Sequence, residues 1–229
     1  MLSARDRLCD NAIKYLVTLQ SARQIQLGAA ALVGGFEPRR LAAAEADRDF
    51  VLDWARGVDG LILDVGCGPG HWTKYLADDG LLVEGVDPAP EFISSALEQY
   101  PGLRFQVGEA AHLPVGDASL GGVLSWYSLI HVEPAQIGAT LTDLARCVRA
   151  DGGLALAFFE GPELTPFDHA VAPAYFWPID LLATHVEQAG FVVTDTRTRS
   201  DPGARRHGAI TARRISAGRD LAPPRRHID

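Results

Sequence analysis

Cysteine, long apolar runs and excess positive charge are all scarce in this chain, and each shortage excludes a class of protein. Its 3 cysteines, Cys9, Cys67 and Cys147, are far apart and show no metal-ligand spacing. Neither a disulfide framework nor a zinc site is therefore expected. No apolar run reaches the roughly 18 to 20 residues that a bilayer span needs. Residues 1–16 lack the apolar centre of a signal peptide, so we expect a cytoplasmic protein that does not contact membranes.

The charge balance also limits the partners. The 21 lysine and arginine residues are outnumbered by 29 aspartate and glutamate residues, which leaves a net charge of -8. An acidic chain repels phosphate backbones, so no nucleic-acid partner is expected. A length of 229 residues suits one large domain, or a domain with a small appendage.

Hydrophobic periodicity divides the chain into three regions. Helical spacing dominates residues 1–57, which we expect to form a helical flank and a possible lid. From Leu61 onward, short apolar strands alternate with amphipathic helices, a pattern that predicts a mostly parallel α/β sheet. Residues 191–199 and 207–214 read as two strands separated by a turn, which predicts an antiparallel hairpin. Residues 215–229 are rich in helix breakers and predict a flexible tail.

The stretch "LILDVGCGPGHW", residues 61–72, places Asp64 near the end of a strand, ahead of 3 glycines at alternate positions. Such a loop lies where an open α/β sheet binds ligands, and glycine lets the backbone approach a ligand closely. A dinucleotide loop needs G-x-G-x-x-G with a small last residue, but here the spacing is G-x-G-x-G and His71 follows. The pattern therefore points away from NAD. Asp64 suits an ammonium group or an ordered water near a zwitterionic ligand.

Five ordered segments carry a resemblance to one family. "LDVGCGPG" resembles the first motif of class I S-adenosylmethionine-dependent methyltransferases, an acid followed by G-x-G-x-G. "VEGVDPAPEFI", "VGEAAHLP", "LSWYSLIHVEP" and "RCVRADGGLALAFF" resemble its later elements in the same order. The resemblance implies a methyltransferase domain over residues 58–214. Its expected fold is a Rossmann-like, doubly wound, seven-stranded sheet, mostly parallel with a C-terminal antiparallel hairpin and preceded by N-terminal helices.

The resemblance also implies S-adenosyl-L-methionine as the cofactor. Asp87 would accept hydrogen bonds from both ribose hydroxyls, while the Glu109 carboxylate and the Ala110 amide would bind the adenine. Glu109 stands where the family often has aspartate, which lengthens the side chain by one methylene. The full set of expected cofactor contacts is Asp64, Gly66, Cys67, Gly68, Gly70, Asp87, Pro88, Glu109, Ala110 and Trp126.

Methyl transfer needs little specialised chemistry from the protein. The enzyme mainly aligns nucleophile and methyl group in a dry pocket, and it needs a base only for an acceptor that arrives protonated. Histidine titrates near neutral pH, which makes His131, His169 and His207 the candidate bases. For each of them a packing or surface role stays open.

Aromatic side chains after the fourth and fifth strands are the candidate substrate contacts. Tyr127, Tyr175 and Trp177 can wall an apolar or aromatic acceptor, with core packing as the alternative. No metal-binding cluster stands out, and no metal is expected.

We therefore predict a methyltransferase that acts on an oxygen or nitrogen of a small molecule of the secondary-metabolite kind, as a monomer or homodimer. Three alternatives stay open: a cyclase or decarboxylase on the same fold, an NAD-dependent oxidoreductase, and a non-catalytic cofactor-binding protein.

Overall fold

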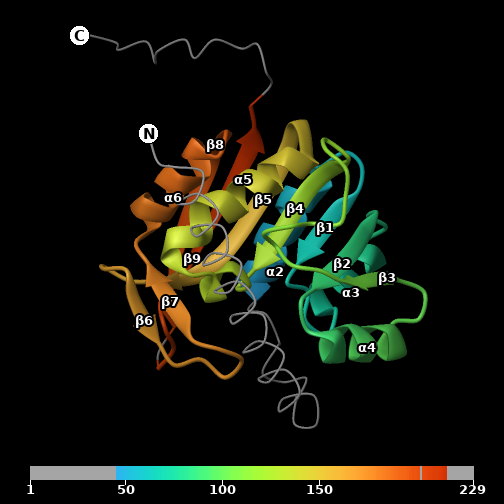
Figure 1. Cartoon of the computed structure of the whole chain (residues 1–229), viewed down its shortest axis with the longest axis horizontal. Coiled ribbons are helices and arrows are strands. Elements are labelled where there is room, and N and C mark those ends of the chain that lie inside the picture. The colour runs from blue at the N-terminus through green and yellow to red at the C-terminus, as the bar shows by residue number, and fades with distance from the viewer. Residues whose placement is uncertain (1–44, 202, 216–229) are drawn as a thin grey trace, which may run out of the picture.

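A mixed sheet of 9 strands runs through the part of the chain that the computed structural model describes, residues 45–201 and 203–215 (Figure 1). The five parallel strands are β1 (Ile62–Val65), β2 (Val83–Asp87), β3 (Arg104–Val107), β4 (Leu120–Trp126) and β5 (Val148–Glu160). They lie in the order β3-β2-β1-β4-β5. The strand order reverses between β1 and β4, which places a ligand crevice at their carboxyl ends.

Two antiparallel strands follow β5 in the sheet. β8 (Phe191–Arg199) pairs with β9 (His207–Arg214), and β9 in turn pairs with β5. The predicted hairpin is therefore confirmed over the expected residues, and so is the mostly parallel, doubly wound fold.

The remaining two strands were not expected, because the sequence around them reads as a long loop. β7 (Ala174–Trp177) pairs in parallel with Phe159 and Glu160 of β5, just past Ala157, where the pairing with β4 ends. β6 (Thr165–Phe167) then pairs antiparallel with β7. The β6–β7 hairpin thus extends the sheet at the carboxyl end of β5, which makes nine strands in place of the expected seven.

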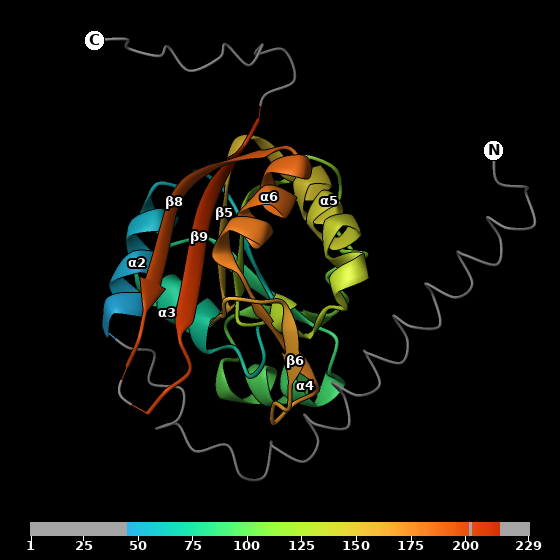
Figure 2. The ribbon, with the colours of Figure 1, turned by 90° about the vertical axis from the view of Figure 1, so that its left-hand side faces the viewer.

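Helices cover both faces of the sheet. They are α2 (Glu45–Arg56), α3 (His71–Asp78), α4 (Pro90–Gln99), α5 (Ile137–Cys147) and α6 (Ile179–Gln188). Figure 2 shows α2 and α3 on one side of the sheet and α5 and α6 on the other. The core is divided in the same way, since Val51 of α2 and Leu76 of α3 pack in one cluster, and Leu141 of α5 and Leu182 of α6 in another.

Both ends of the chain extend past the described residues. α2 forms the last part of the predicted helical flank, whereas residues 1–44 and the predicted tail beyond Ile215 lie outside the described residues. None of the helices in residues 45–201 and 203–215 has the length and apolar character that crossing a bilayer requires.

Candidate functional site

All three glycines of the loop after β1 have left-handed backbones, with φ of +73° at Gly66, +54° at Gly68 and +85° at Gly70. They differ in what a side chain would meet. A Cβ on Gly66 would lie 2.1 Å from the Cβ of Ser128, and one on Gly70 would lie 2.7 Å from Cζ of Phe105. A Cβ on Gly68 would have no atom within 4 Å. Gly66 and Gly70 are therefore required by the protein's own packing, and Gly68 leaves room for a ligand.

Asp64 joins the end of β1 to the helix that follows the glycine loop. Its carboxylate is 1% exposed and accepts a hydrogen bond from the Thr73 hydroxyl at 2.7 Å. Burial raises the pKa of Asp64 to about 7, partly offset by that hydrogen bond. Asp64 therefore fixes the two ends of the loop relative to each other.

Asp87, at the end of β2, binds the backbone of the same loop. Its Oδ2 accepts from the amide of Gly68 at 2.9 Å, and its Oδ1 accepts from the amide of Ala89 at 2.8 Å. Each carboxylate oxygen can accept a second hydrogen bond. Burial raises the pKa of Asp87 to about 6. The half-buried Pro88 follows and leads into α4.

Glu109 begins a tight turn just after β3, in which the amide of His112 donates to the Glu109 carbonyl at 3.1 Å. Two residues of α5 hold this turn. Asp143 accepts from the amide of Leu113 at 3.0 Å, and Arg146 Nε donates to Asp143 at 2.8 Å. Sequence reasoning missed both residues, because nothing local to α5 shows that it faces a turn 30 positions earlier.

Three other residues expected to contact the cofactor are buried or partly buried near the carboxyl ends of the strands. Cys67 and Trp126 are buried, and Ala110 is partly buried against the core. The Trp126 ring packs against Phe50 and Trp72, with centroid separations of 6.0 and 5.4 Å. Its Nε1 is buried and has no hydrogen-bond acceptor among the described residues.

Two of the three candidate histidines contact the same ring at the carboxyl end of the sheet, and the third contacts one of those two. Phe159 of β5 lies 6.1 Å from the His169 ring and 5.6 Å from the His207 ring, and His131 lies 5.0 Å from His169. We call the six rings gathered here the aromatic cluster: Tyr127, His131, Phe159, Phe167, His169 and His207.

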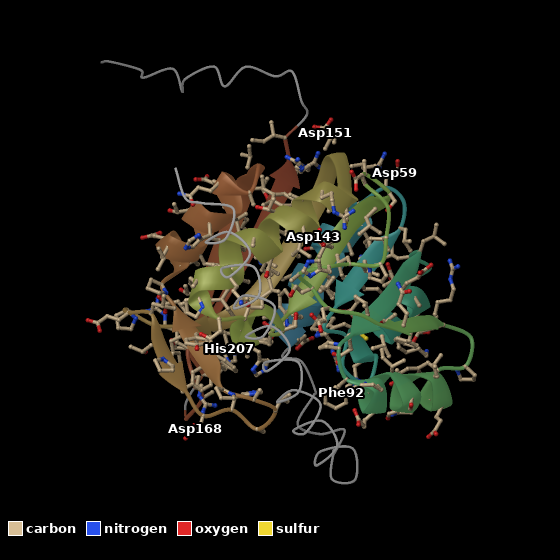
Figure 3. All side chains as sticks on the ribbon, viewed as in Figure 1. Asp59, Phe92, Asp143, Asp151, Asp168 and His207 are labelled. Atoms are coloured by element: carbon tan, nitrogen blue, oxygen red, sulfur yellow. The ribbon has the colours of Figure 1, made fainter. Side chains whose placement is uncertain are left out.

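The end of the sheet at which this cluster lies is visible in Figure 3. His207 lies at the same end as Phe92 of α4, and Asp59 and Asp151 lie at the opposite end. The carboxyl ends of the parallel strands thus meet both the glycine loop and the aromatic cluster.

The three histidines differ in their surroundings. Burial lowers the pKa of each, and it lowers the pKa of His169 to about 4, with His131 and Arg205 contributing. His131 donates from Nδ1 to the carbonyl of Pro173 at 3.0 Å. His207 differs in having its Nε2 within 4.0 Å of a carboxylate, that of Asp201.

Tyr127 and the residue after it link the aromatic cluster to the glycine loop. It follows β4 with φ of +59°, a left-handed conformation that bulky residues seldom adopt. Its amide donates to the carbonyl of Ala157 at 3.0 Å, and its hydroxyl lies 2.6 Å from Nδ1 of His207. The next residue, Ser128, donates to the carbonyl of Val65 at 2.6 Å and packs on Gly66. Strain of this kind persists where surrounding contacts hold it, often at functional sites.

The other two predicted substrate residues are placed differently. Tyr175 is half-buried and donates its hydroxyl to Glu133 at 2.8 Å. Trp177 is 1% exposed, packs in the core cluster that includes α6, and contacts the ring of His185 at 5.9 Å. Trp177 therefore packs in the core, which is the alternative that the sequence left open.

No group of three or more histidine, cysteine or carboxylate residues within the described ranges is arranged to hold a metal ion. The described chemistry of the site thus consists of the glycine loop, two buried carboxyl groups and the aromatic cluster.

Comparisons with known proteins agree with this arrangement. A family model described as a methyltransferase domain matches residues 62–152. The demethylmenaquinone methyltransferase of Beutenbergia cavernae is 34% identical over 107 residues, which cover 47% of this chain and 44% of that protein. The chain spans about half the length of the curated relatives it matches.

Solved structures share the fold. The 1,6-didemethyltoxoflavin-N1-methyltransferase of Burkholderia thailandensis superimposes with a TM-score of 0.73 at 24% identity, over 87% of this chain and 91% of that one. A [4+2]-cyclase superimposes with a TM-score of 0.65 at 16% identity, over 75% of this chain and 81% of that one. The matched domain and the related sequences make this chain similar to methyltransferases over residues 62–152, and the solved structures show that it shares their fold.

Proposed function

We propose that this protein transfers a methyl group from S-adenosyl-L-methionine to an oxygen or nitrogen of a small aromatic molecule. The observation that carries the proposal is the position of the aromatic cluster, at the same end of the sheet as the glycine loop. A donor site and an acceptor site at neighbouring strand ends are what direct group transfer requires.

The residues at the first site fit the methyl donor. The open side of Gly68 allows a ligand to approach the backbone, and the two oxygens of Asp87 retain capacity to accept from vicinal hydroxyls. Glu109 and Ala110 begin the turn after β3, the next strand outward from β2, and we expect them to contact the adenine. S-adenosyl-L-methionine, when bound there, supplies a methyl group whose bond to sulfur breaks as the new bond forms, so that sulfur leaves as a neutral thioether.

The aromatic cluster fits a planar acceptor. Phe159 and Phe167 lie 5.5 Å apart in an edge-to-face arrangement, and Arg205 lies over the Phe167 ring at 4.6 Å. Rings and a guanidinium group bind flat, electron-rich molecules by stacking and cation–π contact. The names of two similar proteins, a demethylmenaquinone methyltransferase and a didemethyltoxoflavin methyltransferase, are consistent with a ring-bearing acceptor.

Incubation with methyl-labelled S-adenosyl-L-methionine and a panel of hydroxylated and amino-substituted aromatic compounds tests the proposal. We expect label in at least one acceptor together with equimolar S-adenosylhomocysteine, and loss of both products in Asp87→Ala. Conversion of a candidate substrate with no label transfer would instead assign non-methylating chemistry, such as that of the cyclase with the same fold.

A further inference from the structure

The hydroxyl of Tyr127 and the imidazole of His207 form a close pair across the sheet. Their atoms are 2.6 Å apart and their rings meet edge to face at 5.6 Å. Tyr127 follows β4, and His207 begins β9, 80 positions later. Phe159 of β5 backs both rings, at 5.1 Å from Tyr127 and 5.6 Å from His207.

Charged groups from two other elements face the far side of His207. Its Nε2 lies 4.0 Å from Asp201, which pairs with Nε of Arg199 at 3.1 Å. Arg199, the last residue of β8, also pairs with Asp47 of α2 at 2.9 Å. The two carboxylates favour the charged imidazole, whereas burial and Arg199 oppose it.

This arrangement favours one direction of the hydrogen bond. Burial lowers the pKa of His207 and raises the pKa of Tyr127, so at neutral pH the imidazole is neutral and the phenol keeps its proton. The Nε2–H tautomer directs its proton toward Asp201 and leaves Nδ1 to accept from the Tyr127 hydroxyl. The phenol oxygen then has lone pairs free to accept a proton from a bound acceptor.

We propose that Tyr127 Oη receives the acceptor's proton during methyl transfer and passes its own proton to Nδ1 of His207. This inference rests on the proposed function. The acceptor's oxygen or nitrogen loses its proton as its bond to the methyl carbon forms. Tyr127 ends as it began, a neutral phenol, and His207 ends as an imidazolium beside Asp201, from which the proton returns to solvent. Tyr127 is then the catalytic residue, and His207, which acts through it, is a positioning residue.

The other two histidines lack this arrangement. His131 already donates Nδ1–H to the carbonyl of Pro173. His169 has a pKa lowered to about 4, which makes it a weak proton acceptor at neutral pH. Within residues 45–201 and 203–215, neither forms the carboxylate contact that His207 makes with Asp201.

Histidine ¹⁵N spectroscopy of the full chain tests the pair without any acceptor. We expect His207 to be the Nε2–H tautomer in the wild type. In Tyr127→Phe its pKa should rise, because a hydrogen bond to the neutral form has been removed. An Nδ1–H tautomer in the wild type, or a pKa unmoved by Tyr127→Phe, would overturn the proposal even if methyl transfer is observed.

Kinetics with an acceptor from the labelled panel provide the second test. Tyr127→Phe should lower kcat by about 10²-fold, the scale of general-base catalysis, with the affinity for S-adenosylhomocysteine unchanged. His207→Gln should remove the acid limb of the kcat profile, which reports the titration of the imidazole. Tyr75→Phe on α3 and His185→Gln on α6 serve as controls and should keep wild-type kinetics. Wild-type kcat and pH profile in both Tyr127→Phe and His207→Gln would refute the relay and leave the methyltransferase proposal standing.

Discussion

Replacing Gly68 with alanine tests whether a glycine is needed at this position to bind a ligand, and not only to form the fold. Gly68 has φ of +54°, and a Cβ there would meet no protein atom within 4 Å. The cost to folding is therefore the left-handed backbone alone, about 1 to 2 kcal/mol for a residue with a side chain. For a protein of this size that cost lowers Tm by roughly 2 to 8 °C. The added methyl group points into the space that we assign to the cofactor.

Gly80, just past the other end of α3, provides a matched control. Gly80 has φ of +85°, and a Cβ there would likewise meet no atom within 4 Å, but Gly80 follows the far end of the helix. Gly80→Ala should therefore lose a similar amount of stability through the same backbone strain. Its affinity for S-adenosylhomocysteine should equal that of the wild type.

Thermal unfolding and titration calorimetry together decide the case. We expect Gly68→Ala to bind S-adenosylhomocysteine at least about tenfold more weakly, a loss of about 1.4 kcal/mol, while Gly80→Ala binds normally. Equal affinity in folded Gly68→Ala and Gly80→Ala would refute this assignment, because the open side of Gly68 would then not face the cofactor.

Three further predictions follow from the same contacts. We propose that the ionised form of Asp87, whose pKa is about 6, accepts the ribose hydroxyls. Affinity for S-adenosylhomocysteine should then be constant above pH 6 and fall by up to about tenfold per unit below it, and calorimetry of Asp87→Asn should show no such fall. Thr73→Val removes the hydrogen bond to Asp64, whose pKa is about 7. The free energy of unfolding, measured with denaturant, should fall by about 1 to 3 kcal/mol at pH 8 and by less at pH 5, where Asp64 is protonated. An equal loss at both pH values would contradict an ionised Asp64. Phe167→Ala should raise the KM for an aromatic acceptor and leave cofactor affinity unchanged, and an unchanged KM would place the acceptor elsewhere.

The parts of the fold that local pattern determines were predictable from the sequence. The hairpin of β8 and β9 follows from two runs separated by a turn, and the three positive φ values of the glycine loop follow from residue type. The β6–β7 hairpin was missed because its strands are short, Pro166 interrupts the first, and β7 is held by a partner on β5. Such pairing leaves no periodic signal in the segment itself.

The site likewise combines contacts that the sequence predicts with contacts that depend on how distant strands pair. Asp87 and Gly68 are 19 positions apart and still follow from one family pattern, which the structure joins by a 2.9 Å hydrogen bond. Sequence reasoning proposed His207 and Tyr127 separately, in different roles, because their contact depends on how β4, β5 and β9 lie side by side. It also left Trp177 between an acceptor contact and core packing, since an aromatic residue after a strand looks the same whether it faces a ligand or the core.

Titration calorimetry of the full chain with S-adenosylhomocysteine, with NADH as the rival ligand, tests the central claim most directly. We predict one S-adenosylhomocysteine bound per chain, its loss in Asp87→Ala, and no binding of NADH. Binding of NADH in place of S-adenosylhomocysteine, or S-adenosylhomocysteine affinity that Asp87→Ala leaves intact, would contradict the proposed cofactor site.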